Sequence, residues 1–346
     1  MEIAFFIVFN YEVNTKTAKI ADSIEKNNIF HIKFAILSKT SSYCIIPKNS
    51  HQGYSLPYLL KKYDITETKK VEDFLVDVVK LSETLAHKLL RNARIVDHKK
   101  RRLQKGKILK SGYIEVLIFE PITKGLKPLF QTEHFALFDK PSGLIVHPTV
   151  RSTEYTLLDE IRYQFGDEAK LVHRIDAETS GLVLVSKNDY AGYVLKEMFA
   201  KKEFVKKYKA LVENELKEEI LINKKITTSE GLIKLKMQTS ENGKESSTQI
   251  RPIAYNKTKN QTLVEAIPHT GRQHQIRVHL DSISHRIVGD PIYGLDESFV
   301  DEFLNNKIEK SKRIQTTGAS RLMLHAYYLE FTFLKRSYVF CSKQEF

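Results

Sequence analysis

A carboxylate and a guanidinium stand close together in one polar segment of the chain. Arg174 and Asp176 lie within residues 173–181, and apolar residues flank this segment, Val172 before it and residues 182–185 after it. This order of apolar, polar and apolar residues predicts a strand, a loop and a second strand, which hold Asp176 rigidly at a cleft. An isolated Arg-x-Asp more often caps a turn as an ordinary ion pair. The motifs that accompany it therefore decide whether it does chemistry.

The charge of the chain favours a polyanionic partner. Fifty-five Lys and Arg against 42 Asp and Glu give a formal net charge of +13. Residues 88–110 hold ten of the basic residues and one acid, Asp97, a density that favours phosphate binding over a merely solvated face. The side chains that we expect to bind RNA are Lys88, Arg91, Arg94, Lys99, Lys100, Arg101 and Arg102.

Length and composition predict a globular protein of the cytoplasm. The chain has 346 residues, enough for two or three domains, and 42% of them are hydrophobic. Cys44 and Cys341 form no C-x-x-C motif, so we expect reduced thiols and no structural zinc. The apolar residues 1–9 lack a basic region and a cleavage site, which favours a buried strand over a signal peptide. We expect a monomer without a membrane partner.

The chain divides into three segments. Residues 1–54 contain short β-like runs such as residues 30–37 but no motif, and their role is unknown. Residues 55–120 have apolar side chains at helical spacing over 71–79 and again over 85–90. Ser82 is the expected N-cap of the second helix and Asn92 its expected end, and strands are expected at 94–97 and 113–119.

The third segment, residues 121–346, has a different sequence pattern. It opens with a linker at 121–128, and from residue 131 strand-like runs alternate with Gly and Pro. Helices are expected near 156–163 and 190–201. Alternation over residues 204–212 places Tyr208 on one face of a strand and its two flanking lysines on the other.

Five blocks of the third segment resemble the RluA family of RNA pseudouridine synthases, in the family's order. They are residues 138–148, 173–181, 204–212, 269–280 and 321–326, with Gly289–Gly294 after the fourth. One departure is Ser284-His285-Arg286, where the family usually has Gly-His-Pro, so the local turn is expected to differ. Residues 55–120 resemble an S4 RNA-binding domain more weakly, since Gly112-Tyr113 replaces the usual Gly-Asp.

The resemblance implies a fold and a reaction. The fold is α+β, with a mixed, largely antiparallel sheet crossed by the active cleft, and a small α+β S4-like domain before it. The reaction breaks the N1–C1′ bond of a uridine within RNA and forms a C5–C1′ bond, without a metal or an organic cofactor. The expected target is structured RNA, first of all 23S ribosomal RNA, with a tRNA or dual target as the alternative.

The resemblance also assigns site residues. Asp176 is the nucleophile or, in the competing scheme, the base acting at C2′, and Arg277 keeps it ionised in a dry pocket. Tyr208 stacks on the uracil and is a candidate for removing the C5 proton, while Arg174 helps to displace the base from its stack. The remaining substrate-binding residues implied are His173, Thr179 and two apolar walls that exclude water, Ile276 and Leu324.

Two other functions stay open. One is a ribosome-associated RNA-binding protein that has lost activity. The other is an N-glycosidase, in which Glu178 is the adjacent carboxylate that activates water. A zinc site is not expected from His269, His274 and His279, because a spacing of five residues places neighbours on different faces of a strand or helix. We expect these histidines to form hydrogen bonds in the core or to contact RNA.

Overall fold

The computed structural model describes residues 58–148 and 155–343. The strands expected at residues 1–9 and 30–37, and with them the first segment and Cys44, lie outside the described residues. Within the described ranges, no helix has the length and apolar content needed to cross a membrane.

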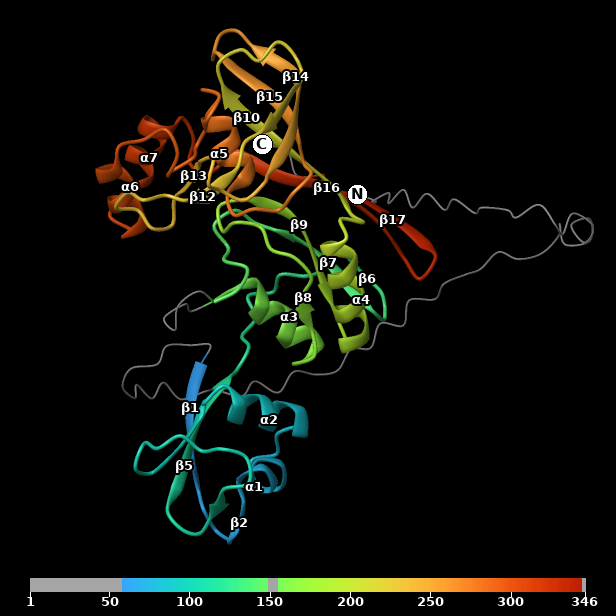
Figure 1. The fold of residues 1–346 in the computed structure, drawn as a ribbon, viewed down its shortest axis with the longest axis vertical. Helices are drawn as coiled ribbons and strands as arrows, with labels where there is room; N and C mark the ends of the chain where they lie inside the picture. The colour runs from blue at the N-terminus through green and yellow to red at the C-terminus, as the bar shows by residue number, and fades with distance from the viewer. Residues whose placement is uncertain (1–57, 149–154, 344–346) are drawn as a thin grey trace, which may run out of the picture. The chain divides into compact units, whose positions relative to one another are not determined.

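Residues 58–119 form two helices and a small antiparallel sheet around their own core (Figure 1). The elements are β1 (Tyr58–Asp64), β2 (Lys69–Lys70), α1 (Val71–Asp77), α2 (Glu83–Arg91), β3 (Ile95–Asp97), β4 (Ile108–Leu109) and β5 (Tyr113–Phe119). The sheet order is β1-β5-β3. As predicted, the Ser82 hydroxyl accepts a hydrogen bond from the Leu85 N–H at 3.3 Å, and the helix ends at Asn92. The predicted helix pair and both predicted strands are thus confirmed.

Ten further strands build the sheet that carries the site. They are β6 (Phe130–Gln131), β7 (Phe135–Lys140), β8 (Lys170–Leu171), β9 (Ser180–Ser186), β10 (Val205–Glu213), β11 (Ile220–Asn223), β14 (Ser247–Asn256), β15 (Gln261–Pro268), β16 (Leu324–Phe333) and β17 (Arg336–Cys341). The order is β11-β14-β15-β10-β16-β9-β7-β6, with β17 paired to β16 and β8 to β9. Only the β16–β9 pair of this sheet is parallel among the described strands. The predicted mixed, largely antiparallel sheet is confirmed.

Helices cover both faces of the sheet around β7 and β9. Phe135 and Leu137 pack with α4 (Asp189–Ala200), whereas Ala136 and Phe138 pack with α3 (Leu157–Phe165) on the other face. Since both faces are covered, all seven residues of β9 are buried. Both helices lie where the sequence predicts them.

A third helix covers the other half of the sheet. Side chains of α5 (Gln275–Asp281) pack with residues of β10, β14 and β15 in one hydrophobic cluster. The rest of the described chain contains α6 (Glu297–Leu304), α7 (Lys310–Thr317), and a two-stranded sheet of β12 (Ile226–Thr228) and β13 (Met237–Thr239). Figure 1 shows α6 and α7 side by side, next to the α5 half of the fold.

The turn in which the sequence departs from the family has a left-handed backbone. Ser284 has φ +60°, a conformation that glycine adopts without strain. Arg286 forms an ion pair with Glu213, and its Nη1 donates to the Gly294 carbonyl at 3.3 Å. The added positive charge therefore stays within the protein, where it ties this turn to β10.

Candidate active site

Asp176 lies in a loop between β8 and β9, as the flanking apolar residues predict. The Thr179 N–H donates to the Asp176 carbonyl at 3.2 Å, which closes the turn. At the start of β9, Gly181 has φ +115°, and a Cβ on it would lie 2.3 Å from the Ala326 carbonyl oxygen. Only glycine therefore lets β9 and β16 approach closely enough to hold the loop against the middle of the sheet.

A buried lysine stabilises this loop by donating hydrogen bonds to backbone carbonyls. Lys140 is fully buried, and its Nζ donates to the carbonyls of Pro141, Leu144 and Ala177 at 2.9, 2.8 and 2.8 Å. Burial lowers the pKa of Lys140 to about 7, while the charges of Asp176 and Glu178 oppose this shift. Three carbonyl acceptors match the three N–H bonds of an ammonium group, so the site is built for the protonated form.

Arg277 contacts Asp176 from α5. Its Nη1 lies 3.1 Å from Asp176 Oδ2, while Nε and Nη2 donate to both carboxylate oxygens of Asp290 at 2.7 and 2.8 Å. Burial opposes the charge of Arg277, but the Asp290 carboxylate outweighs it and raises the pKa of Arg277. The predicted contact between Asp176 and Arg277 is present, and Asp290 is a second acid that fixes the guanidinium.

Asp176 is less shielded than the sequence analysis predicts. Its side chain is 25% exposed, whereas the side chains of Arg277 and Asp290 are 2% and 1% exposed. Arg174, two residues before Asp176 in the same loop, is exposed. The free protein therefore does not have the expected dry pocket, because Asp176 is partly exposed although Arg277 and Asp290 beside it are buried.

His274 lies on the other side of the same carboxylate. Its Nε2 is 3.8 Å from Asp176 Oδ2, and its Nδ1 is 3.0 Å from the Tyr293 hydroxyl. That hydroxyl also accepts from the Met237 N–H at 3.1 Å, so Tyr293 ties His274 to β13. Burial and the charge of Arg277 lower the pKa of His274 to about 4, which leaves a neutral imidazole beside Asp176.

Tyr208 and two apolar side chains lie on the sheet face that α5 covers. Tyr208 of β10 pairs with Ala326 of β16 and is half-buried. Ile276 and Leu324 are buried in the same hydrophobic cluster as the ring of Tyr208. Burial and the charge of Asp176 raise the pKa of Tyr208, so its hydroxyl is neutral at neutral pH.

Two of the predicted substrate-binding residues, His173 and Thr179, do not face Asp176 and Tyr208. The His173 ring accepts from the Leu184 N–H at 3.1 Å and stacks on Phe199 with a centroid distance of 5.0 Å. It is turned into the core, where burial lowers its pKa to about 3. Thr179 is 2% exposed and serves the turn. In this conformation both residues support β9 and the loop instead of facing Asp176.

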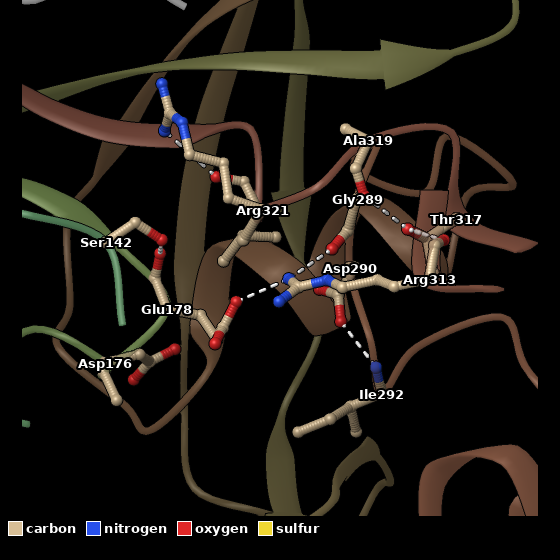
Figure 2. A network of polar contacts seen from close by, with 12 residues as sticks. Ser142, Asp176, Glu178, Gly289, Asp290, Ile292, Arg313, Thr317, Ala319 and Arg321 are labelled. Atoms are coloured by element: carbon tan, nitrogen blue, oxygen red, sulfur yellow. Dashed lines mark hydrogen bonds and ion pairs between the residues drawn. The ribbon is translucent and has the colours of Figure 1, made fainter. Parts of the chain in front are cut away.

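Glu178 forms an ion pair with a helix far along the chain. Its Oε2 lies 2.5 Å from Arg313 Nη2 of α7, as Figure 2 shows beside Asp176. Glu178, the carboxylate that the sequence suggests for activating water, is therefore paired with the Arg313 guanidinium.

The histidines of the fourth block differ in their surroundings. His279 is buried, with Nδ1 2.9 Å from the Thr248 hydroxyl and Nε2 2.9 Å from the Lys224 carbonyl. His274 binds Tyr293, and His269 is exposed. The prediction of hydrogen-bonding core histidines is confirmed for His274 and His279. No three side chains of His, Cys, Asp or Glu are grouped as metal ligands in the described part of the chain.

The basic residues after α2 are not equally available. Lys88 and Arg94 are half-buried, whereas Arg91, Lys99 and Arg102 are exposed. Lys100 and Arg101 pair with acids: Lys100 Nζ lies 2.5 Å from Glu115, and Arg101 Nη2 lies 2.7 Å from Asp97. The Asp97 carboxyl is nearly buried, which opposes its charge, but hydrogen bonds from Arg101 outweigh this and lower its pKa to about 2. These two cations are thus partly neutralised within the protein.

A family model and curated relatives agree on the family of this chain. The RNA pseudouridylate synthase family model matches residues 134–282. An uncharacterized RNA pseudouridine synthase of Helicobacter pylori is 35% identical over 290 residues, which cover 83% of this chain and 96% of the relative. The ribosomal large subunit pseudouridine synthase D of Zymomonas mobilis is 32% identical, over 61% of this chain and 66% of the relative.

A solved structure supports the fold. Human RNA pseudouridylate synthase domain containing 1 matches with a TM-score of 0.51 and 24% identity, over 65% of this chain and 86% of that one. The family match includes Asp176, Tyr208 and Arg277, and the sheet is the one expected for this family. The chain therefore belongs to the RNA pseudouridine synthase family, and it is an isomerase that acts on uridine in RNA.

Proposed function

We propose that Asp176 is the catalytic carboxylate and that Arg277 pairs with it and orients it. The observation that carries this proposal is the 3.1 Å contact of Asp176 with a buried guanidinium, which Asp290 holds by two further hydrogen bonds. The carboxylate either attacks C1′ as N1 leaves or removes a proton at C2′. The uracil then turns and C5 bonds to C1′. This step releases the carboxylate in the first scheme and returns the proton to C2′ in the second, after which C5 loses its proton and N1 carries one.

Arg174 is the residue that we assign to displacing the target base. It is exposed in the loop, two residues before Asp176. A uridine in structured RNA has to leave its stack before any carboxylate reaches its ribose. We assign this displacement to Arg174, and the exclusion of water from the extruded nucleotide to Ile276 and Leu324. The exposed edge of Asp176 is then covered by the nucleotide itself.

Tyr208 is assigned as a stacking residue for the uracil. A base at C5 has to be able to accept a proton, and the raised pKa of Tyr208 keeps its hydroxyl protonated. We expect Tyr208→Phe to keep turnover within about tenfold of wild type, and Tyr208→Leu to lose considerably more, because an aromatic face is what stacks. Rates at saturating RNA measure this. A loss of 10²-fold or more in Tyr208→Phe would instead assign the proton transfer to the hydroxyl.

The proposed substrate is structured ribosomal RNA of the large subunit, 23S ribosomal RNA, in the cytoplasm. The similarity to enzymes described as ribosomal large subunit pseudouridine synthase D supports this target. Mapping pseudouridines by carbodiimide and primer extension in total RNA, from cells with and without the gene, tests it. A modification lost from 23S RNA is expected, whereas a loss confined to tRNA would replace this target by the alternative.

Residues 55–120 are proposed to act as an S4-like RNA-binding domain, separate from the catalytic domain at 121–346. The helix pair, the small sheet with its own core, and the exposed Arg91, Lys99 and Arg102 support this role. Removing residues 1–120 is expected to weaken RNA binding more than it slows chemistry on saturating short substrates. The salt dependence of binding should also become shallower, because fewer phosphates are neutralised. An equal loss of affinity and of rate would contradict separable roles.

A further inference from the structure

Asp176 and Asp290 are carried by two loops that are distant in the sequence. Asp176 precedes β9, whereas Gly289 and Asp290 follow α5. Backbone hydrogen bonds tie each loop to its own surroundings, since the Ala177 carbonyl accepts from Gly143 and the Gly289 N–H donates to Thr317. Two hydrogen bonds fix the Arg277 guanidinium to Asp290. The distance between Arg277 and Asp176 therefore depends on how the loop of Asp176 and the loop of Asp290 are held together.

Arg313 of α7 reaches both loops with one nitrogen. Its Nη2 donates to Glu178 Oε2 at 2.5 Å and to the Gly289 carbonyl at 3.0 Å (Figure 2). The side chains of Arg313 and Glu178 are only 12% and 20% exposed. Solvent screens this pair less than an ordinary surface ion pair, so its geometry is better defined.

The same helix binds both the N–H and the carbonyl of Gly289. The Gly289 N–H donates to the Thr317 carbonyl at 2.7 Å, at the C-terminal end of α7, while the Gly289 carbonyl accepts from Arg313. Gly289 has φ +80°, and a Cβ on it would lie 1.8 Å from the Arg321 carbonyl oxygen, so no other residue fits there. The residue next to Asp290 is thereby fixed to α7.

A packing contact orients the guanidinium. Its Cζ lies 5.0 Å from the centroid of the Phe303 ring, which belongs to α6. The two helices therefore present one oriented cation to the loops of the active site. Figure 2 shows this cation between Glu178 and Gly289, with Asp176 on the far side of Glu178.

We propose that Arg313 is a positioning residue, which sets the separation of Asp176 from Arg277 by holding Glu178 and Gly289 on one nitrogen. This inference rests on the proposed role of Asp176. Arg313 makes no contact with Asp176 itself, so its loss leaves the catalytic groups in place but less well aligned. A displacement of about 1 Å at a reacting group costs up to about 10²-fold in rate. The loss of Arg313 should lower kcat and leave KM nearly unchanged, because neither Arg313 nor Glu178 is assigned to RNA binding.

The test compares Arg313→Met with Lys312→Met, its neighbour on the same helix. Lys312 pairs with Glu302, and both side chains are about half exposed, so its loss controls for removing an α7 cation. We expect Arg313→Met to lower kcat by about 10- to 100-fold with KM within about threefold, and Lys312→Met to resemble wild type. Arg313→Lys should recover most of the rate, because one ammonium nitrogen donates to both acceptors.

A double-mutant cycle with Glu178→Gln shows whether Arg313 acts through Glu178. If it does, Arg313→Met together with Glu178→Gln should lower kcat little further than Arg313→Met alone. Each rate is measured below the thermal transition of that variant and is expressed per folded enzyme. A kcat for Arg313→Met equal to that of Lys312→Met would overturn the proposal, as would a loss explained by the unfolded fraction. Undiminished turnover by Asp176→Asn would overturn the proposed function instead.

Discussion

Replacing Arg277 by methionine should abolish measurable turnover and lower the free energy of unfolding by about 3–5 kcal/mol. The substitution leaves Asp290, whose side chain is 1% exposed, as a buried carboxylate without its cation. It also removes the donor that lies 3.1 Å from Asp176. Urea unfolding and tritium release from RNA labelled at C5 of uridine measure the two effects. Arg272→Met, which changes an exposed arginine of the same block, is the matched control and should alter neither greatly.

A second substitution separates the two roles of Arg277. Changing Asp290 to asparagine in the Arg277→Met background removes the buried charge but keeps an oxygen that accepts from the Ile292 and Tyr293 N–H groups, so stability should largely recover. Turnover should not, because Asp176 still lacks its cation. A double variant that regains both would mean that Arg277 matters for stability alone.

Asp176→Asn should lower turnover by at least about 10³-fold while leaving RNA affinity within about threefold. The amide keeps the size of the side chain but is neither a nucleophile nor a base of useful strength. The variant should stay folded, because Arg277 retains both hydrogen bonds to Asp290. Filter binding and steady-state rates measure the two quantities, with Asp167→Asn, an exposed carboxylate, as the control. Residual turnover above a few per cent would refute the assignment.

The sequence was sufficient for the parts of the molecule that local patterns determine. The helices around residues 71–77 and 83–91 follow from apolar spacing and from the Ser82 cap. The contact of Asp176 with Arg277 follows from family blocks that lie about a hundred residues apart. Both kinds of signal depend on the types and the spacing of residues, which the sequence contains in full.

The supporting residues were not predicted because their roles arise only in three dimensions. Lys140 is a lysine with no exposed surface, against the usual behaviour of its residue type, and three carbonyls that are close only in the fold surround it. Arg313 is 135 positions from Glu178, in a stretch without a motif. Asp290 lies within residues 289–294, which resemble the family, but the sequence does not show that it accepts two hydrogen bonds from Arg277. That contact depends on the position of α5.

The arrangement also distinguishes isomerisation from hydrolysis. An N-glycosidase needs a second carboxylate that activates water. Glu178 is the adjacent candidate, and Arg313 binds it at 2.5 Å. The Glu178 oxygen that accepts from Arg313 is already occupied, and the side chains of Ile276 and Leu324 are buried and apolar, so they offer no polar group that would hold a water. These contacts favour return of the uracil to C1′ over attack by water.

The most direct test follows the products of one RNA, labelled with tritium at C5 of its uridines, under excess enzyme. Wild-type protein should release tritium into water without liberating free uracil, and Asp176→Asn should do neither while it still binds the RNA. Free uracil as the main product, or tritium release by Asp176→Asn at the wild-type rate, would contradict an isomerisation that depends on the carboxylate beside Arg277.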